Sequence, residues 1–291
     1  MDQENPESAT QSSFSGTLKL QEFMYTPTEP VVRRSRRAIS QVATSTVTTQ
    51  LSSSKKRPSQ DTTANLTRED DEKSPKKKKN KNVPSGYAPP SMYAHLNGLP
   101  DRIADDLILL FIGLNPGIQT ARTGHAYAHP TNLFWKLLFT SGITPRPCKA
   151  EEDQDMPALY SLGLTNIVAR PSRNGAELHK KEMDEGVAIL EEKAAKHRPE
   201  AMCIVGKSIW ESIWRVKHGK NIRKNEFRYG WQDDEENMGI IDGEWEGAKV
   251  FVASSTSGLA ATLSPADKQK IWDELGTWVK QRRLERQDKT N

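Results

Sequence analysis

The residues best suited to chemistry lie in a short glycine-bearing stretch that follows an apolar run. Asn115 stands within residues 113–117 (GLNPG), directly behind the apolar run 107–112. A glycine turn at the end of a buried strand brings backbone N–H groups close to a ligand. The stretch is not a dinucleotide fingerprint, because GxGxxG is absent, nor a P-loop, because no GK[ST] follows. Taken alone, it is an ordinary strand-to-helix loop with Asn115 as a turn residue.

Alternating strands and helices must position this loop. Short apolar runs predict buried strands at 107–112, 163–168, 201–206 and 249–253. Helical patterns lie between them, and such alternation predicts an α/β fold with a mostly parallel central sheet and helices on both faces.

Candidate caps indicate where three of these helices begin. Thr131, Ser208 and Ser264 each precede an amphipathic stretch, and Ser264 is followed by Pro265, which favours the first helical position. Residues 217–248 are charged and glycine-bearing and are expected to form an irregular excursion.

A longer motif around the GLNPG stretch changes the interpretation. Residues 113–135 read GLNPGIQTARTGHAYAHPTNLFW. This resembles the motif of the mismatch-specific thymine/uracil DNA glycosylases: G-[IL]-N-P-G, a spacer, G-[HF]-x-[FY], then P-x-N-x-F-W. The resemblance continues in GLTNIVAR, VGK and SSTSGL, which occupy residues 163–170, 205–207 and 254–259. It covers roughly residues 87–283, so a glycosylase domain of uracil-DNA-glycosylase-like fold is expected there.

The resemblance implies roles for individual residues. Asn115 falls where the family positions the attacking water, and Tyr127 falls where it stacks the flipped base. Tyr127 as a core aromatic is the competing interpretation. The remaining base-pocket positions are Gly113, Leu114, Thr120, His125 and Asn166, of which the last three have loop hydrogen bonding or a structural role as alternatives.

A second matched segment would enter the duplex. Ser257, Gly258 and Leu259 match the family's insertion loop, with Leu259 as the plug that fills the gap left by the flipped nucleotide and Ser257 as a phosphate contact. The alternative for Leu259 is a core residue. The chain departs from the family pattern at Thr256 and Ala261, where related enzymes have Pro and Arg, which puts reading of the orphaned guanine in doubt.

These positions imply a monofunctional DNA glycosylase that hydrolyses mispaired uracil or thymine (G·U, G·T) in double-stranded DNA and thereby initiates base excision repair. An amide orients water but does not take its proton, so the reaction is expected to be dissociative, with slow turnover and tight product binding. No lysine stands at a matched nucleophile position, which predicts hydrolysis rather than a Schiff-base lyase step. Two rivals remain open: a catalytically weak mismatch or damage sensor, and a same-fold glycosylase for hypoxanthine or etheno bases.

Cofactors are not expected. The chain has two cysteines, which cannot hold a four-cysteine iron–sulfur cluster. His125 and His129 are four residues apart but lack an acidic neighbour in the sequence, so no metal is assigned to them.

The N-terminal segment carries the basic character. Residues 1–86 hold 15 Lys and Arg against 10 Asp and Glu, whereas the whole chain has a net charge of +4. The segment is rich in Ser and Thr and poor in aromatics, so it is expected to be a disordered tail. Its basic clusters, notably Lys76, Lys77, Lys78 and Lys79, are either a solvated tail or a non-specific DNA tether combined with a nuclear-import signal.

The remaining expectations concern environment and assembly. Residues 284–291 are expected to form a short C-terminal tail, and no run of about 18 apolar residues suggests a membrane span. The expected protein is a nuclear monomer whose partners are double-stranded DNA with a mismatched or damaged base and a downstream abasic-site repair enzyme.

Overall fold

The structure is a computed structural model that describes residues 86–290. The predicted disorder of 1–86 and the predicted tether at Lys76–Lys79 therefore concern residues outside the described part of the chain, apart from Gly86.

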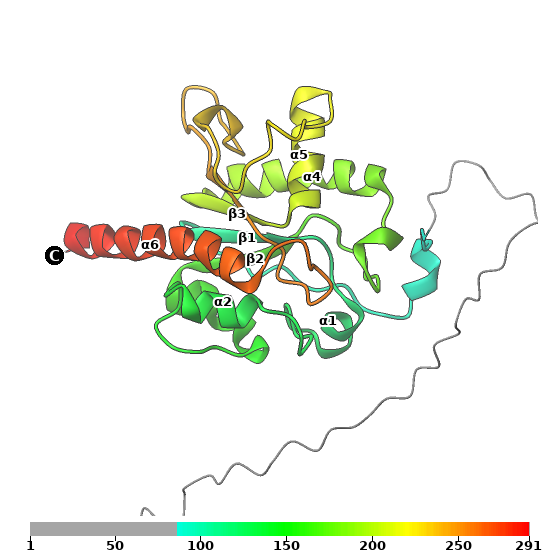
Figure 1. Ribbon diagram of the computed structural model, residues 1–291. Helices are drawn as coiled ribbons and strands as arrows, with labels where there is room; N and C mark the ends of the chain where they lie inside the picture. Colours follow the sequence, from blue (N-terminus) through cyan, green and yellow to red (C-terminus); the bar gives the residue numbers. More distant parts are fainter. Residues whose placement is uncertain (1–85, 291) are drawn as a thin grey trace, which may run out of the picture. The chain divides into compact units, whose positions relative to one another are not determined.

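A five-stranded sheet forms the centre of the molecule, with strand order β2-β1-β3-β5-β4 (Figure 1). Its parallel strands are β1 (Leu109–Gly113), β2 (Leu162–Asn166), β3 (Ala201–Val205) and β5 (Lys249–Ala253). They confirm the mostly parallel sheet and the four strand positions predicted from apolar runs, with ends that shift by up to two residues. The fifth strand, β4 (Gly230–Trp231), pairs antiparallel with β5.

The strand β4 corrects the expectation for residues 217–248. That segment is largely irregular but supplies an edge strand of two residues. A strand of two residues is too short to show a hydrophobic period in the sequence. Its pairing depends on where β5 lies in space.

Helices cover both faces of the sheet (Figure 1). One core cluster joins Met202 and Val252 to α4 (Lys180–His197) and α5 (Lys207–His218). The other joins Cys203 and Phe251 to α2 (Phe134–Thr140), α3 (Met156–Tyr160) and α6 (Pro265–Thr290). Neighbouring strand residues point to opposite faces, and both faces are buried, so the strands read as continuous apolar runs. The shorter elements are α1 (Ile118–Thr123) and the 3-10 turns Pro90–Tyr93, Ala150–Asp155, Gly175–Glu177 and Asp234–Glu236.

One of the three predicted helix caps is confirmed. The Ser264 hydroxyl accepts a hydrogen bond from the Asp267 N–H at 3.1 Å, at the start of α6. The other two are wrong: α5 begins one residue before Ser208, and α2 begins behind Leu133. The side chain of Thr131 instead bonds the His129 ring at 2.9 Å. Competing loop contacts made by these hydroxyls are invisible in a sequence pattern.

The C-terminal helix is longer than expected. Residues 284–290, predicted as a tail, continue α6. Beyond the predicted boundary, Arg286 donates from Nε to a carboxylate oxygen of Glu200 at 2.6 Å and from Nη1 to the Asp106 carbonyl at 2.8 Å. These contacts tie the extension to the domain. Within residues 86–290, no helix is both long and apolar enough to cross a bilayer.

Candidate functional site

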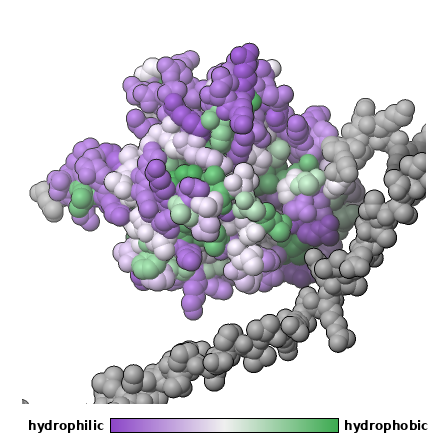
Figure 2. Space-filling model, viewed as in Figure 1, coloured by the Kyte–Doolittle hydropathy of each residue, from purple (hydrophilic) through white to green (hydrophobic). Residues whose placement is uncertain are grey.

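A cavity of about 730 Å³ lies at the carboxyl ends of the parallel strands. This edge is where ligands bind in open α/β sheets, because the loops that leave the strands meet there. The loops after β1, β2 and β5 line it, and apolar surface gathers near the middle of the face shown in Figure 2. The cavity brings together nine of the ten predicted pocket and insertion-loop residues: Gly113, Leu114, Asn115, Thr120, Tyr127, Asn166, Ser257, Gly258 and Leu259.

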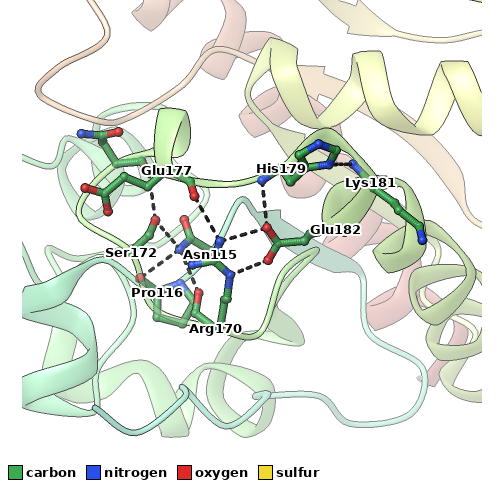
Figure 3. Close-up of polar contacts among 9 residues, drawn as sticks. Asn115, Pro116, Arg170, Ser172, Glu177, His179, Lys181 and Glu182 are labelled. Carbon is green, nitrogen blue, oxygen red and sulfur yellow. Dashed lines mark hydrogen bonds and ion pairs between the residues drawn. The ribbon is translucent and has the colours of Figure 1, made fainter. Parts of the chain in front are cut away.

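The Asn115 side chain is fixed by its amide nitrogen. Its Nδ2 donates to the Arg170 carbonyl and to the Ser172 hydroxyl oxygen, each at 2.9 Å, and lies 3.2 Å from the Pro116 carbonyl (Figure 3). Carbonyl oxygens only accept hydrogen bonds, so the donor end of the amide must face them. The acceptor Oδ1 therefore remains for a water or a ligand, since no donor among residues 86–290 bonds it.

An ion pair holds the backbone that anchors Asn115. The Arg170 guanidinium binds the Glu182 carboxylate through Nε and, at 2.9 Å, through Nη2 (Figure 3). Glu182 also accepts from the backbone N–H of His179 at 2.8 Å, at the start of α4. The hydrogen bond from Arg170 is the main cause that lowers the pKa of Glu182 below its ordinary value. The paired, partly buried charges hold the Arg170 carbonyl in place for the Asn115 amide.

Tyr127 presents an aromatic ring to the cavity. The ring lies parallel to Phe134, with centroids 3.9 Å apart and planes at 13°, so one face is packed against the core. Because Tyr127 also lines the cavity, both earlier interpretations apply: it packs on the core and offers surface to a ligand. Its backbone has φ 53°, a left-handed conformation that is uncommon outside glycine. Such a conformation costs free energy and is typical of functional sites.

The Tyr127 hydroxyl is buried and has no hydrogen-bond partner among the described residues. Burial raises the pKa of this phenol far above its ordinary value, so it stays a protonated donor at any working pH. An orphaned buried polar group costs free energy.

Gly113 leaves the space in which two polar groups approach each other. A Cβ at this position would lie 2.4 Å from Asn166 Oδ1 and 2.9 Å from the Tyr127 hydroxyl. Gly113 pairs with Asn166 in the register of β1 and β2, which explains why the two meet. Glycine is required here for close approach, and the Asn166 amide lines the cavity as predicted.

His125 is the one predicted pocket residue that does not line the cavity. Its Nδ1 lies 3.2 Å from Asp153 Oδ1, and the same buried carboxylate accepts the Ala126 N–H at 2.7 Å. The structure therefore supports the structural alternative, in which His125 helps to anchor the loop that carries Tyr127. Thr120 is buried and lines the cavity as predicted.

The insertion loop exposes its leucine. The Leu259 side chain is 79% exposed, so the alternative that it is a core residue is wrong. Hydrogen bonds to other parts of the domain hold the loop backbone. The Leu133 N–H donates to the Thr256 carbonyl at 2.9 Å, and Lys268 Nζ donates to the Ala260 carbonyl at 2.7 Å. A large exposed apolar side chain at the rim of a cavity is suited to enter another molecule.

Two residues that the sequence did not single out complete the site. Ser172 bonds Asn115 and donates its own hydroxyl hydrogen to the Asn174 carbonyl at 2.9 Å. Arg173, next to it, also lines the cavity. Both follow β2, and Ser172 is 57 residues from Asn115, so no local spacing connects them. The matched segment 163–170 stops short of both residues and gave no signal for either.

The described residues offer no cluster of potential metal ligands. Within 86–290, no group of three or more His, Cys, Asp and Glu converges, and Cys148 and Cys203 are both buried and unbridged.

The sheet and its cavity define an α/β protein with a ligand-sized cavity at the carboxyl edge of a mostly parallel sheet. The Uracil DNA glycosylase superfamily model matches residues 100–276, more than half of the chain, and the protein belongs to this superfamily.

Two relatives add detail. The chain is 39% identical over 193 residues to the G/U mismatch-specific uracil DNA glycosylase of Schizosaccharomyces pombe, an alignment that covers 65% of this chain and 56% of that protein. The chain thus spans little more than half the length of this relative. A solution NMR structure from Methanosarcina acetivorans, provisionally named a uracil DNA glycosylase, matches 63% of this chain and 98% of its own, at 17% identity and a TM-score of 0.42. A score this low does not by itself establish a shared fold.

Proposed function

We propose that this protein is a monofunctional DNA glycosylase that removes uracil, and also thymine, mispaired with guanine in double-stranded DNA. The observation that carries the proposal is the Asn115 amide, which is anchored through Nδ2 and lines a cavity together with Tyr127 and the exposed Leu259. Superfamily membership and the relative named for G/U mismatches support the substrate class.

The geometry suits a reaction in which the base leaves before water attacks. Asn115 Oδ1 accepts a hydrogen bond from water and directs the water oxygen toward C1′ of the flipped nucleotide. None of the described residues that line the cavity is Asp or Glu, so no carboxylate there takes the proton of this water. The N-glycosidic electrons leave with the base, the water oxygen bonds C1′, and the proton passes to the base or solvent. The products are free base and an abasic site.

The Tyr127 ring and the Asn166 amide are placed to act on the base. Both residues line the cavity, where the ring can stack on a flipped pyrimidine and the amide nitrogen can donate to its hydrogen-bonding edge. Charge that builds on the departing base in the transition state is stabilised by such a preorganised donor.

Single-turnover base release tests the proposal. Duplexes holding G·U, G·T and A·U are incubated with wild type and with Asn115→Ala. We expect uracil release opposite guanine by wild type, reduced about 100-fold or more in the variant while duplex binding survives, because the water loses its orienting acceptor.

The same experiment decides between the rivals. Binding of wild type to mismatched duplexes without release of any base supports a damage sensor, and release of hypoxanthine or etheno bases alone supports a different substrate. Equal release by wild type and Asn115→Ala contradicts the role of this residue.

The cellular setting is part of the proposal. An abasic site is the substrate of a downstream repair enzyme, which places this reaction at the start of base excision repair. The basic clusters within residues 1–86, including Lys76–Lys79, are consistent with nuclear import and with a tether to DNA. A monomer is part of the proposal.

Deleting residues 1–85 tests the tether. We expect weaker non-specific duplex binding and a flatter dependence of log K on log salt concentration, because each lost phosphate contact removes about 0.9 from the slope. A titration of an unmodified duplex at several salt concentrations measures this slope. An unchanged slope contradicts the tether.

A further inference from the structure

Besides His129, the described residues that line the cavity include one basic side chain, and none of the preceding assignments uses it. Among the described residues that line the cavity, Arg173 is the only Lys or Arg, and no Asp or Glu accompanies it. Its side chain is 75% exposed, so the guanidinium is open to a partner. A nucleotide whose base enters the cavity brings its backbone phosphates close to the cavity mouth. A cation at the mouth would therefore meet an anion when DNA is bound.

The backbone around Arg173 is firmly placed although its side chain is exposed. Glu177, which is buried, accepts the Arg173 backbone N–H at 2.9 Å and the Tyr93 hydroxyl at 2.9 Å. The same carboxylate lies 3.3 Å from the Arg173 guanidinium. Burial alone would raise the pKa of Glu177, but these hydrogen bonds and the Arg173 charge lower it below its ordinary value. The guanidinium is thus held near the cavity mouth, and only part of its donor fork is used.

Sheet order separates Arg173 from the insertion loop. Arg173 follows β2, and Leu259 follows β5, with β1 and β3 between these two strands. Three strand spacings amount to about 14 Å. Arg173 and Leu259 therefore follow strands at different places along the edge of the sheet, and both line the cavity.

We infer that Arg173 is a positioning residue that binds a backbone phosphate next to the flipped nucleotide. This inference rests on the proposed function, because it requires the nucleotide to enter the cavity. The contact fixes the nucleotide at its phosphate, while the insertion loop fills the gap that the base leaves. Since phosphate carries no sequence information, Arg173 adds affinity without choosing the opposite base.

The first test compares Arg173→Gln with wild type in binding to duplexes that carry a non-hydrolysable 2′-fluorinated uridine opposite guanine or adenine. We expect affinity to fall by roughly tenfold on both duplexes, as for loss of a charge-assisted hydrogen bond. The slope of log K against log salt should fall by about 0.9. Arg173→Lys should recover much of the affinity, because it restores the charge.

Arg228→Gln is the matched control. Arg228 is half-exposed and binds Asp233 at 2.7 Å, an ion pair like that of Arg173, but it does not line the cavity. We expect its affinity and salt slope to match those of wild type. A loss of affinity for G·U alone in Arg173→Gln would indicate that Arg173 reads guanine and would overturn the inference.

A double-substitution cycle identifies the phosphate directly. A neutral methylphosphonate is placed at the phosphate on the 5′ or the 3′ side of the fluorinated uridine. At the contacted position it should weaken wild type about tenfold and Arg173→Gln less than about twofold, because the partner is already lost. Equal weakening of both proteins at both positions overturns the inference.

Failure of this inference can be distinguished from failure of the proposed function. It measures binding only, so failure of wild type to release uracil would reject the glycosylase proposal while the coupling between Arg173 and a phosphate could still be present. Conversely, uracil release with no coupling would reject only the role of Arg173. Thermal unfolding of each variant checks that the loop remains folded.

Discussion

The loops after β1 and β5 border the same cavity, yet the protein holds their key side chains in opposite ways. Asn115, after β1, has three acceptors around its amide nitrogen. One of them is the Arg170 carbonyl, and the Arg170 side chain is fixed by an ion pair with Glu182. Leu259, after β5, is 79% exposed, and its loop is held by the Thr256 and Ala260 carbonyls and by the Ser257 hydroxyl, which accepts the Leu259 N–H at 3.3 Å. In the proposed reaction, Asn115 must be oriented to within a fraction of an ångström, whereas Leu259 must extend from the protein into the DNA.

Physical chemistry explains why each arrangement suits its place. Orienting a water depends on a fixed acceptor, since a misplacement of about 1 Å can cost roughly 100-fold in rate. A wedge gains its free energy inside the DNA stack, so it needs exposure and a supported backbone rather than contacts of its own. The rigid side of the cavity, around Asn115, should therefore be sensitive to packing changes. The exposed side, around Leu259, should be sensitive to loss of apolar surface.

Gly113→Ala is expected to give the largest effect, because it disturbs the rigid side. The new Cβ would lie 2.4 Å from Asn166 Oδ1 and 2.9 Å from the Tyr127 hydroxyl, so both groups must move. We expect single-turnover uracil release to fall about 100-fold, and overpacking to lower the free energy of unfolding by about 1–3 kcal/mol. Kinetics and thermal unfolding measure the two effects. Near-wild-type release would show that the cavity tolerates displacement and that the two loops are less different than proposed.

Leu259→Ala should have an intermediate effect on base release from duplex DNA and almost none on protein stability. Because the side chain is exposed, the free energy of unfolding should change by less than about 0.5 kcal/mol. Base release from duplex should fall by roughly tenfold, since the gap left by flipping loses its filler. Leu284→Ala is the control, because Leu284 is 57% exposed on α6 and lies outside the cavity lining. Equal behaviour of the two variants would remove Leu259 from the role of wedge.

Glu182→Gln should give the smallest effect and one that depends on pH. The pKa of Glu182 is lowered in the folded protein, chiefly by Arg170, so its contribution to stability is present above the unfolded pKa of about 4.3 and is lost as pH falls through the folded pKa. The variant should thus be less stable than wild type near pH 7, and the difference should shrink below about pH 4.

Glu185→Gln on the same helix is the control for that experiment. Its ion pair with Lys181 is largely exposed on both sides, so little change is expected at any pH. Chemical unfolding at several pH values provides the comparison. A Glu182→Gln curve that runs parallel to wild type would show that this ion pair does not stabilise the anchored side.

The sequence predicted regular elements better than their ends. Strand β3 reads as a continuous apolar run because both faces of the sheet are covered, and its residues are buried as expected. Thr131 shows the limit: it looked like a cap, but its hydroxyl bonds His129 in the loop. The two-residue strand β4 carried no readable period. Which of several possible hydrogen bonds a side chain forms depends on neighbouring groups that a local sequence pattern does not show.

The sequence by itself determined the α/β class and nine of the residues that line the cavity, because buried runs and a long motif are properties of neighbouring positions. Only the tertiary structure decided that Ser172 fixes Asn115, that His125 turns to Asp153, and that Leu259 is exposed rather than buried. Each of these depends on segments that are far apart in the chain and are brought together by strand order. Side-chain orientation at such a meeting point is set by the partners present there, which no spacing in a single segment records.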